Sequence, residues 1–285
     1  MDHPPGPADA LHRLHRLPGV AEGVGEAREA CDRLRRHPAM RRRADEVRAE
    51  ATVRAAHASA ALDGARVDVD VVRAAFAGSP AADPESATSP PGRDAVGSSV
   101  RGAVRALAEA QRLGSGWASG APVVPMQALA RLHLAAAAEL VGEDVLGRPR
   151  REAPGDAVEA RLESLASLLR APADVPALLV AAIAHAEVVG ASPFVAGNGV
   201  VARALARAVV IGRGLDPTGA AVWEAGLLAA GPQASAALAG YAGGKPAGVA
   251  AWLRCWAGAV VAGAAEGRSV ADAVLAGRVT QGAQA

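Results

Sequence analysis

Aromatic side chains are scarce in this chain of 285 residues. Phe, Trp and Tyr together make up 2% of the sequence, although 51% of it is hydrophobic. A core of Ala, Val and Leu suits closely packed helices, whereas strands favour a larger share of β-branched and aromatic residues. The composition therefore predicts an all-α fold, and the length is sufficient for one large domain.

Cysteine and long hydrophobic runs are scarce as well. Cys31 and Cys255 lie far apart without metal-ligand spacing, so we expect neither a disulfide framework nor a zinc site. The first residues lack the apolar region of a secretory signal. The apolar run at 176–190 contains His185 and Glu187 and is too short for a membrane span. We therefore expect a cytoplasmic protein with no membrane partner.

Strong net charge is also missing, since the formal net charge is +1. Arginine supplies every basic residue except Lys245, a skew typical of GC-rich bacterial genomes. The arginines between Arg33 and Arg48 alternate with acidic residues and have no aromatic neighbours. This pattern favours a solvated helix face, and we expect no nucleic-acid partner. The sequence leaves self-association open.

Segments rich in Pro, Gly and Ser divide the chain into parts. We predict a flexible arm at 1–18, a helical layer at 19–77, a mobile loop at 78–97, a helical core at 98–268 and a tail at 269–285. Helical periodicity predicts helices at about 20–37 and 39–60, and another from Val67. Further helices are predicted at about 98–113, 125–141, 156–170, 175–189, 199–213, 219–230, 233–243 and 246–265.

The segment ASPFVAGNGVVARALARAVV (191–210) carries the clearest chemical signal. A Gly-Asn-Gly turn that leads into a helix leaves backbone N–H groups free to bind an anion, most often a phosphate. Arg203 follows one turn later and leans back towards the helix start, with Arg207 one turn beyond it on the same face. The candidate anion- or nucleotide-binding residues are therefore Gly197, Asn198, Gly199 and Arg203. The alternative is a turn that only caps the helix.

The same turn matches a second pattern. Gly197, Gly199 and Ala202 form a G-x-G-x-x-A sequence, as in the dinucleotide fingerprint of NAD(P)-dependent oxidoreductases. That fingerprint requires a preceding strand within a strand-helix-strand unit. Here an Ala-rich predicted helix precedes the turn, so the oxidoreductase interpretation is the least favoured.

Three separated segments resemble the Fic, or Fido, family. Ser192–Arg203 (SPFVAGNGVVAR) is similar to the family motif H-P-F-x-[D/E]-G-N-G-R-x-x-R, and Leu129–Arg150 is similar to the helix that ends in G-x-x-R. Ser59–Gly64 (SAALDG) resembles the inhibitory motif S-x-x-x-E-[G/N], with Asp63 in place of Glu. The resemblance implies a Fic-like helical fold in one domain. It also implies an inhibitory-type motif formed by Ser59, Asp63 and Gly64.

The departures from the motif fall on its chemical groups. In the family the motif His is the general base, the acid binds Mg²⁺, and an arginine follows the last Gly; these positions are Ser192, Ala196 and Val200 here. A hydroxyl is a poor proton acceptor near neutral pH, and Ala offers no metal ligand. Only REAPG separates Arg150 from the next predicted helix. The β-hairpin flap that docks a target in the family is therefore expected to be reduced or absent.

The sequence thus predicts a catalytically degenerate Fic-like protein without ordinary adenylyltransferase activity. We expect it to bind ATP, another phosphate ligand or a protein partner, without Mg²⁺ or any other metal. The alternative is an active AMP transferase with a rebuilt site, in which His185 is a weak candidate for the base. His133 is a second weak candidate, although both are more typical of packed histidines. We also expect Asp63 and Arg203 to form a partly buried ion pair.

Overall fold

The computed structural model describes residues 7–77, 95–150 and 157–278, and within these ranges the protein is helical without a strand. The first part contains α1 (Pro7–His15), α2 (Val20–Arg35), α3 (Pro38–Arg42), α4 (Ala44–Leu62) and α5 (Val69–Phe76). The second part contains α6 (Ala95–Ala118) and α7 (Pro125–Ala137). The third part contains α8 (Ala157–Leu169), α9 (Ala177–Ala191), α10 (Asn198–Gly212), α11 (Trp223–Ala230), α12 (Pro232–Ala242) and α13 (Pro246–Leu275). The predicted all-α architecture is confirmed.

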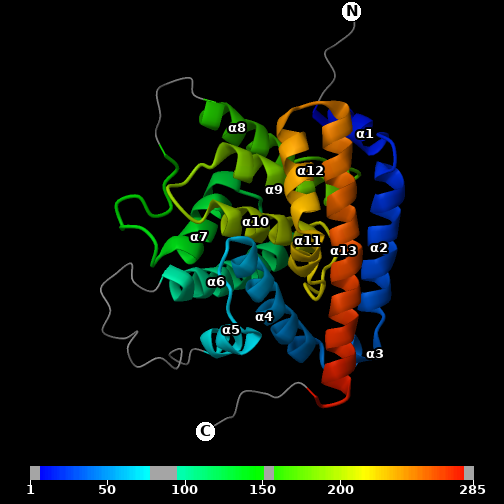
Figure 1. Cartoon of the computed structure of the whole chain (residues 1–285). Coiled ribbons are helices and arrows are strands. Elements are labelled where there is room, and N and C mark those ends of the chain that lie inside the picture. Colours follow the sequence, from blue (N-terminus) through cyan, green and yellow to red (C-terminus); the bar gives the residue numbers. More distant parts are fainter. Residues whose placement is uncertain (1–6, 78–94, 151–156, 279–285) are drawn as a thin grey trace, which may run out of the picture.

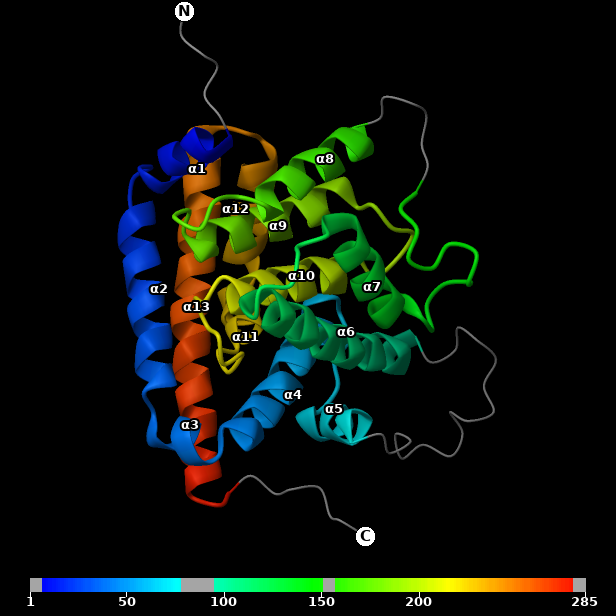
Figure 2. The same cartoon turned by 180° about the vertical axis from the view of Figure 1, so that it is seen from behind.

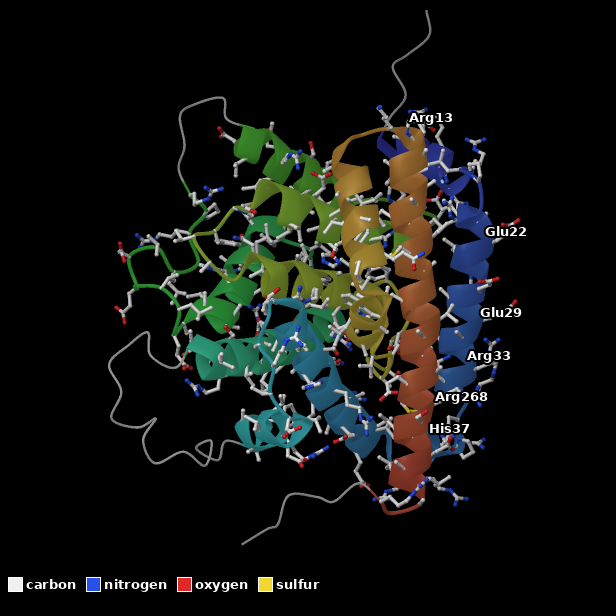
Figure 3. The ribbon with its side chains drawn as sticks, in the orientation of Figure 1. Arg13, Glu22, Glu29, Arg33, His37 and Arg268 are labelled. Carbon is white, nitrogen blue, oxygen red and sulfur yellow. The ribbon has the colours of Figure 1, made fainter. Side chains whose placement is uncertain are left out.

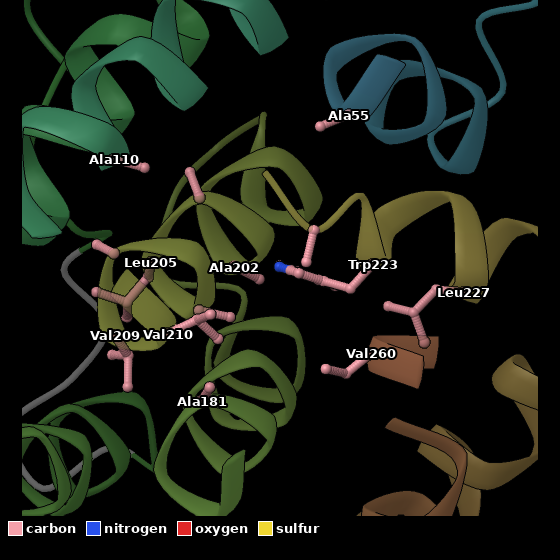
Figure 4. Close-up of a cluster of buried hydrophobic side chains, with 14 of the residues drawn as sticks. Ala55, Ala110, Ala181, Ala202, Leu205, Val209, Val210, Trp223, Leu227 and Val260 are labelled. Carbon is pink, nitrogen blue, oxygen red and sulfur yellow. The ribbon is translucent and has the colours of Figure 1, made fainter. Parts of the chain in front are cut away.

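Helix α10 occupies the centre of the molecule. It packs against α6, α9, α7 and α4, and its side chains from Val200 to Ile211 are all buried. A helix that is buried on every side takes such a central position, and its two arginines, Arg203 and Arg207, are each paired with an acid. Leu205, Val209 and Val210 project from α10 into the surrounding core, as Figure 4 shows. The start of α10, which carries the Gly-Asn-Gly turn, is thereby fixed by the core itself.

Small residues allow the helices around α10 to approach closely. A Cβ atom added at Gly102 of α6 would lie 2.1 Å from the carbonyl oxygen of Ala136 in α7. One added at Gly114 would lie 2.9 Å from the carbonyl oxygen of Ala208 in α10. Both distances are too short for a side chain, so glycine is required at these crossings.

Helices α2 and α13 lie side by side along one edge of the molecule (Figures 1 and 2). α13 also packs against α11 and α12. Contrary to the sequence expectation, one apolar run does meet the length and composition of a membrane span, because α13 has 30 residues and a mean hydropathy of 1.3 over its most apolar window. However, 56% of that window is buried within the fold, as in a core helix of a globular protein.

Charged side chains cover the outer face of α2 and the neighbouring ends of other helices (Figure 3). Several arginines of the basic segment 33–48 pair with nearby acids. Arg33 lies 3.5 Å from Glu29, Arg35 lies 2.8 Å from Asp32, and Arg48 lies 3.0 Å from Asp45. These pairs balance the charge of the helix faces.

The structure corrects the ends of the predicted domain plan. Residues 7–15 of the predicted flexible arm form α1, because Leu11 is buried and Leu14 packs beside it against the core. Residues 269–275 of the predicted tail continue α13, with Val270 and Val274 buried. The predicted mobile loop falls mainly on residues 78–94, and the flap position falls on residues 151–156. Both segments lie outside the described residues.

Candidate functional site

The loop between α9 and α10 reverses the chain at Ser192. This residue has φ 43°, in the left-handed region, and its hydroxyl donates a hydrogen bond to the carbonyl of Val189 over 2.9 Å. Arg150 holds the other side of the loop. Its backbone N–H donates to the carbonyl of Pro193 over 2.7 Å, and its Nε donates to the carbonyl of Ser192 over 3.0 Å. The G-x-x-R segment and the SPF segment, separated in the sequence, are therefore in direct contact in the fold.

Asn198 closes the loop. Its Oδ1 accepts a hydrogen bond from the backbone N–H of Phe194 over 2.9 Å, and its Nδ2 donates to the carbonyl of Phe194 over 2.8 Å. Gly197 adopts φ 75°, which directs the chain into α10. The ring of Phe194 stacks on His133 with centroids 3.9 Å apart and planes inclined by 6°. The turn is therefore anchored by hydrogen bonds on one side and by ring stacking on the other.

Asp63 lies at the start of α10. Its Oδ2 lies 2.8 Å from Nη2 of Arg203. A Cβ atom added at Gly199 would lie only 2.4 Å from Oδ1 of Asp63, so the carboxylate contacts the first turn of α10. The N-terminus of a helix attracts anions through its free N–H groups and its dipole. The carboxylate of the chain itself thus takes the position that the sequence predicts for an external anion.

Arg203 is anchored independently of Asp63. Its Nε donates to Oγ of Ser59 over 2.8 Å, and its Nη2 donates to the carbonyl of Ser59 over 2.9 Å. The side chain of Arg203 is 5% exposed, whereas that of Asp63 is 33% exposed. The expected partly buried ion pair is present, and Ser59, Asp63 and Arg203 meet as the sequence predicts. The more exposed partner is the carboxylate.

Arg207 has a different environment from Arg203. Its Nε lies 2.8 Å from Oε1 of Glu224, and its Nη2 lies 2.5 Å from Oε2. It also donates to the carbonyls of Gly219 and Ala221, each over 3.0 Å. Both members of the pair are buried, so Arg207 joins α10 to α11 and is not part of the Asp63 site. Sequence reasoning missed Glu224, although one acid within the apolar stretch AAVWEAGLLAA was a signal of a buried partner.

Solved structures of Fic proteins resemble this arrangement of helices. A Fic family protein from Desulfovibrio desulfuricans G20 aligns with a TM-score of 0.68 and 20% identity over 88% of this chain and 74% of its own. Fic-1 from C. elegans aligns with a TM-score of 0.60 and 18% identity over 94% of this chain and 75% of its own. The chain has the Fic fold. No family model and no curated protein matches the sequence itself.

His185 and His133, the two histidines considered as candidate bases, are both packed in this Fic-fold chain. His185 accepts a hydrogen bond at Nδ1 from Nε1 of Trp256 over 3.3 Å, and its ring meets the ring of Trp252 edge-on with centroids 5.3 Å apart. Burial, together with the nearby charge of Arg203, lowers the pKa of His185 to about 3. In the described part of the chain, no hydrogen bond joins His185 to Ser192. This geometry does not supply Ser192 with a base.

His133 contributes to packing beneath the Fic-fold loop. Its Nδ1 accepts a hydrogen bond from the backbone N–H of Gly147 over 2.8 Å, and burial lowers its pKa. It therefore links α7 to the G-x-x-R segment while its ring supports Phe194. Sequence reasoning found this histidine but not its stacking partner.

The remaining motif positions carry no metal-binding group. Val200 is buried in the core, and Ala196 is half-buried in the loop. Over the described ranges there is no cluster of three or more His, Cys, Asp or Glu side chains that could hold a metal ion. The dinucleotide interpretation needs a strand before the turn, but the element there is α9.

Proposed function

We propose that this protein is a catalytically degenerate Fic-fold module that binds a phosphate-bearing ligand such as ATP at the start of α10. In this proposal the ligand displaces the carboxylate of Asp63. The observation that carries it is the position of that carboxylate, 2.8 Å from Arg203 and against Gly199. A negatively charged group, as a phosphate also is, already lies there against the helix N-terminus and a guanidinium.

The unequal anchoring of the ion pair supports displacement. Ser59 holds Arg203 through two hydrogen bonds, so the guanidinium keeps its place when the carboxylate leaves. Asp63 is the capping residue after α4, and it is followed by Gly64 with φ 91°. A short, one-third-exposed side chain at a helix end can turn outward without disturbing the core. An incoming phosphate would then find Arg203 and the free N–H groups of α10 in place.

The residues at the three chemical positions favour binding without transfer. Ser192 replaces the general base that the Fic resemblance implies, and a positioned base contributes about 10²–10⁴ in rate. Ala196 and Val200 offer neither a ligand for Mg²⁺ nor a positive charge for the phosphates. We therefore expect a nucleotide to be bound, without magnesium, and left intact.

Calorimetric titration of ATP in the presence of EDTA tests the proposal. Asp63→Ala is expected to bind ATP about tenfold more tightly than the unmodified protein, because the competing carboxylate is gone. Arg203→Gln in the Asp63→Ala background is expected to lose this gain. Asp45→Ala, which removes an exposed acid from the same helix, serves as the matched control and should leave ATP binding unchanged.

Two results would contradict the proposal in different ways. Failure of every variant to bind ATP or inorganic phosphate would show that Asp63 and Arg203 only stabilise the fold. Transfer of labelled AMP from ATP to the protein or to an added protein would support the alternative, an active transferase with a rebuilt site. A radiolabel assay with the Asp63→Ala variant distinguishes these outcomes.

A further inference from the structure

A second pocket lies apart from the loop site. It has a volume of 530 Å³ and is formed by residues of α8, α9, α12 and α13. This volume is within the range of about 300–1,000 Å³ that is usual for small-molecule sites. Val189, Leu238 and Val249 provide apolar walls, together with several alanines. None of the residues proposed to bind phosphate lines this pocket.

Two opposite charges lie in the pocket without bonding to each other directly. Nη1 of Arg161 is 4.0 Å from Oε2 of Glu187, which is beyond hydrogen-bond length. The hydroxyl of Tyr241 donates to the other oxygen of Glu187, Oε1, over 2.6 Å. Burial and this hydrogen bond raise the pKa of Tyr241, which therefore keeps its proton. Glu187 is thus held by one oxygen and presents the other towards Arg161.

Gly190 allows Arg161 to reach this position. A Cβ atom added at Gly190 would lie 2.4 Å from Nη1 of Arg161, so the guanidinium rests directly on the backbone of α9. The side chain of Arg161 is 41% exposed, and among the described residues no partner accepts a hydrogen bond from its guanidinium. Arg161 therefore lines the pocket beside a carboxylate that is only 21% exposed.

We propose that this pocket binds a free α-amino acid with a large apolar side chain. The α-carboxylate would bind Arg161, and the α-ammonium would bind Oε2 of Glu187. An amino acid carries these two charges on one carbon, which matches two protein charges only 4.0 Å apart. The apolar side chain would lie against Leu238 and Val249.

Charge complementarity selects the zwitterion over singly charged ligands. A carboxylic acid without the amine would place its negative charge beside Glu187, and an amine without the carboxylate would place its positive charge beside Arg161. Either ligand would leave one member of the Arg161–Glu187 pair facing a like charge. The zwitterion is neutral overall, as is the pair.

Calorimetric titration of the full-length protein with L-leucine, 4-methylpentanoate and 3-methylbutylamine tests this proposal. L-leucine is expected to bind at least about tenfold more tightly than either singly charged analogue, since each lacks one charge-assisted interaction. L-phenylalanine and L-methionine extend the test to other apolar side chains. Absence of binding by all three amino acids, or equal binding of leucine and 4-methylpentanoate, would overturn the proposal.

Three variants locate the site. Arg161→Gln and Glu187→Gln should each weaken leucine binding about tenfold, because each removes one of the two charges, and Glu187→Gln does so at unchanged side-chain shape. Gly190→Ala should weaken it as well, by moving Arg161 away from α9. Arg170→Gln, which removes an exposed arginine outside the pocket, is the matched control. Leucine binding that survives both Gln substitutions in proteins with unchanged helical circular dichroism would place the site elsewhere and overturn the proposal.

Discussion

Asp63 Oδ2 and Arg203 Nη2, 2.8 Å apart, join the end of α4 to the second turn of α10. A carboxylate at the C-terminal end of a helix faces the negative end of the helix dipole, which is unfavourable. Arg203 and the N-terminus of α10 compensate for this cost. The position of Asp63 therefore depends on α10 rather than on its own helix.

Gly199→Ala tests the contact between Asp63 and α10. Alanine is favoured over glycine in a helix by about 1 kcal/mol, but its Cβ would collide with Oδ1 of Asp63. We expect Gly199→Ala to bring no gain or a loss of stability when Asp63 is present. In the Asp63→Ala background it should stabilise the protein by up to about 1 kcal/mol. Urea unfolding of the four proteins measures this coupling, and equal effects in both backgrounds would contradict the contact.

The buried pair Arg207–Glu224 should contribute far more to stability than the surface pairs. Glu224→Gln leaves the charge of Arg207 buried without its partner, and we expect a loss of about 3–5 kcal/mol. Arg33→Met, at an exposed pair with Glu29, should cost about 1 kcal/mol or less. Chemical denaturation measures both changes. Similar losses for the two variants would show that burial does not determine the contribution.

Asn198 should be required for the closed form of the loop. Asn198→Ala removes both hydrogen bonds to the backbone of Phe194, and we expect a loss of about 1–3 kcal/mol. Asn198→Asp keeps an acceptor for the N–H of Phe194 but loses the donor to its carbonyl, so its effect should be smaller. Thermal unfolding followed by circular dichroism ranks the two variants. The reverse order would contradict the assigned roles of the amide oxygen and nitrogen.

His185 should make the protein less stable in acid. Its pKa is lowered from 6.5 to about 3 in the folded state, so the unfolded chain takes up a proton first as the pH falls. The folding stability that the neutral His185 contributes is fully present above pH 6.5 and is lost as the pH falls towards 3. The slope for this one proton is at most about 1.4 kcal/mol per pH unit.

His185→Gln isolates that dependence. The variant has no titrating group at this position, so the stability difference between it and the unmodified protein should shrink as the pH falls below 6.5. Urea unfolding across this range measures the difference. A difference that stays constant with pH would show that His185 titrates equally in the folded and unfolded states.

Local sequence signals predicted the helices and the geometry at the start of α10 well. The scarcity of aromatic residues and the Ala-rich periodicity indicated helices, and the Gly-Asn-Gly turn placed the start of α10 within one residue of position 199. Ser59 and Asp63 share one helix end, and the Fic resemblance pointed to Arg203 as their partner. The ion pair between Asp63 and Arg203 was predicted from the pairing that the Fic resemblance implies.

Groups that depend on tertiary partners were not predicted. The role of Glu224 as the partner of Arg207 depends on the packing of α11 beside α10, and periodicity does not predict which helices pack together. Arg161, Glu187 and Tyr241 come from three helices, and none belongs to a recognisable motif. α1 was missed because two leucines in a Pro- and His-rich segment form too short a pattern, although Leu11 is buried against the rest of the fold.

The pairing of α2 with α13 has a consequence for synthesis on the ribosome. α2 packs chiefly against α13, and the nearby His37 lies 3.0 Å from Asp272, close to the end of that helix. The ribosome therefore releases α2 long before its main partner exists. During synthesis the buried face of α2 therefore stays uncovered until α13 has emerged, and this part of the fold forms only after that point.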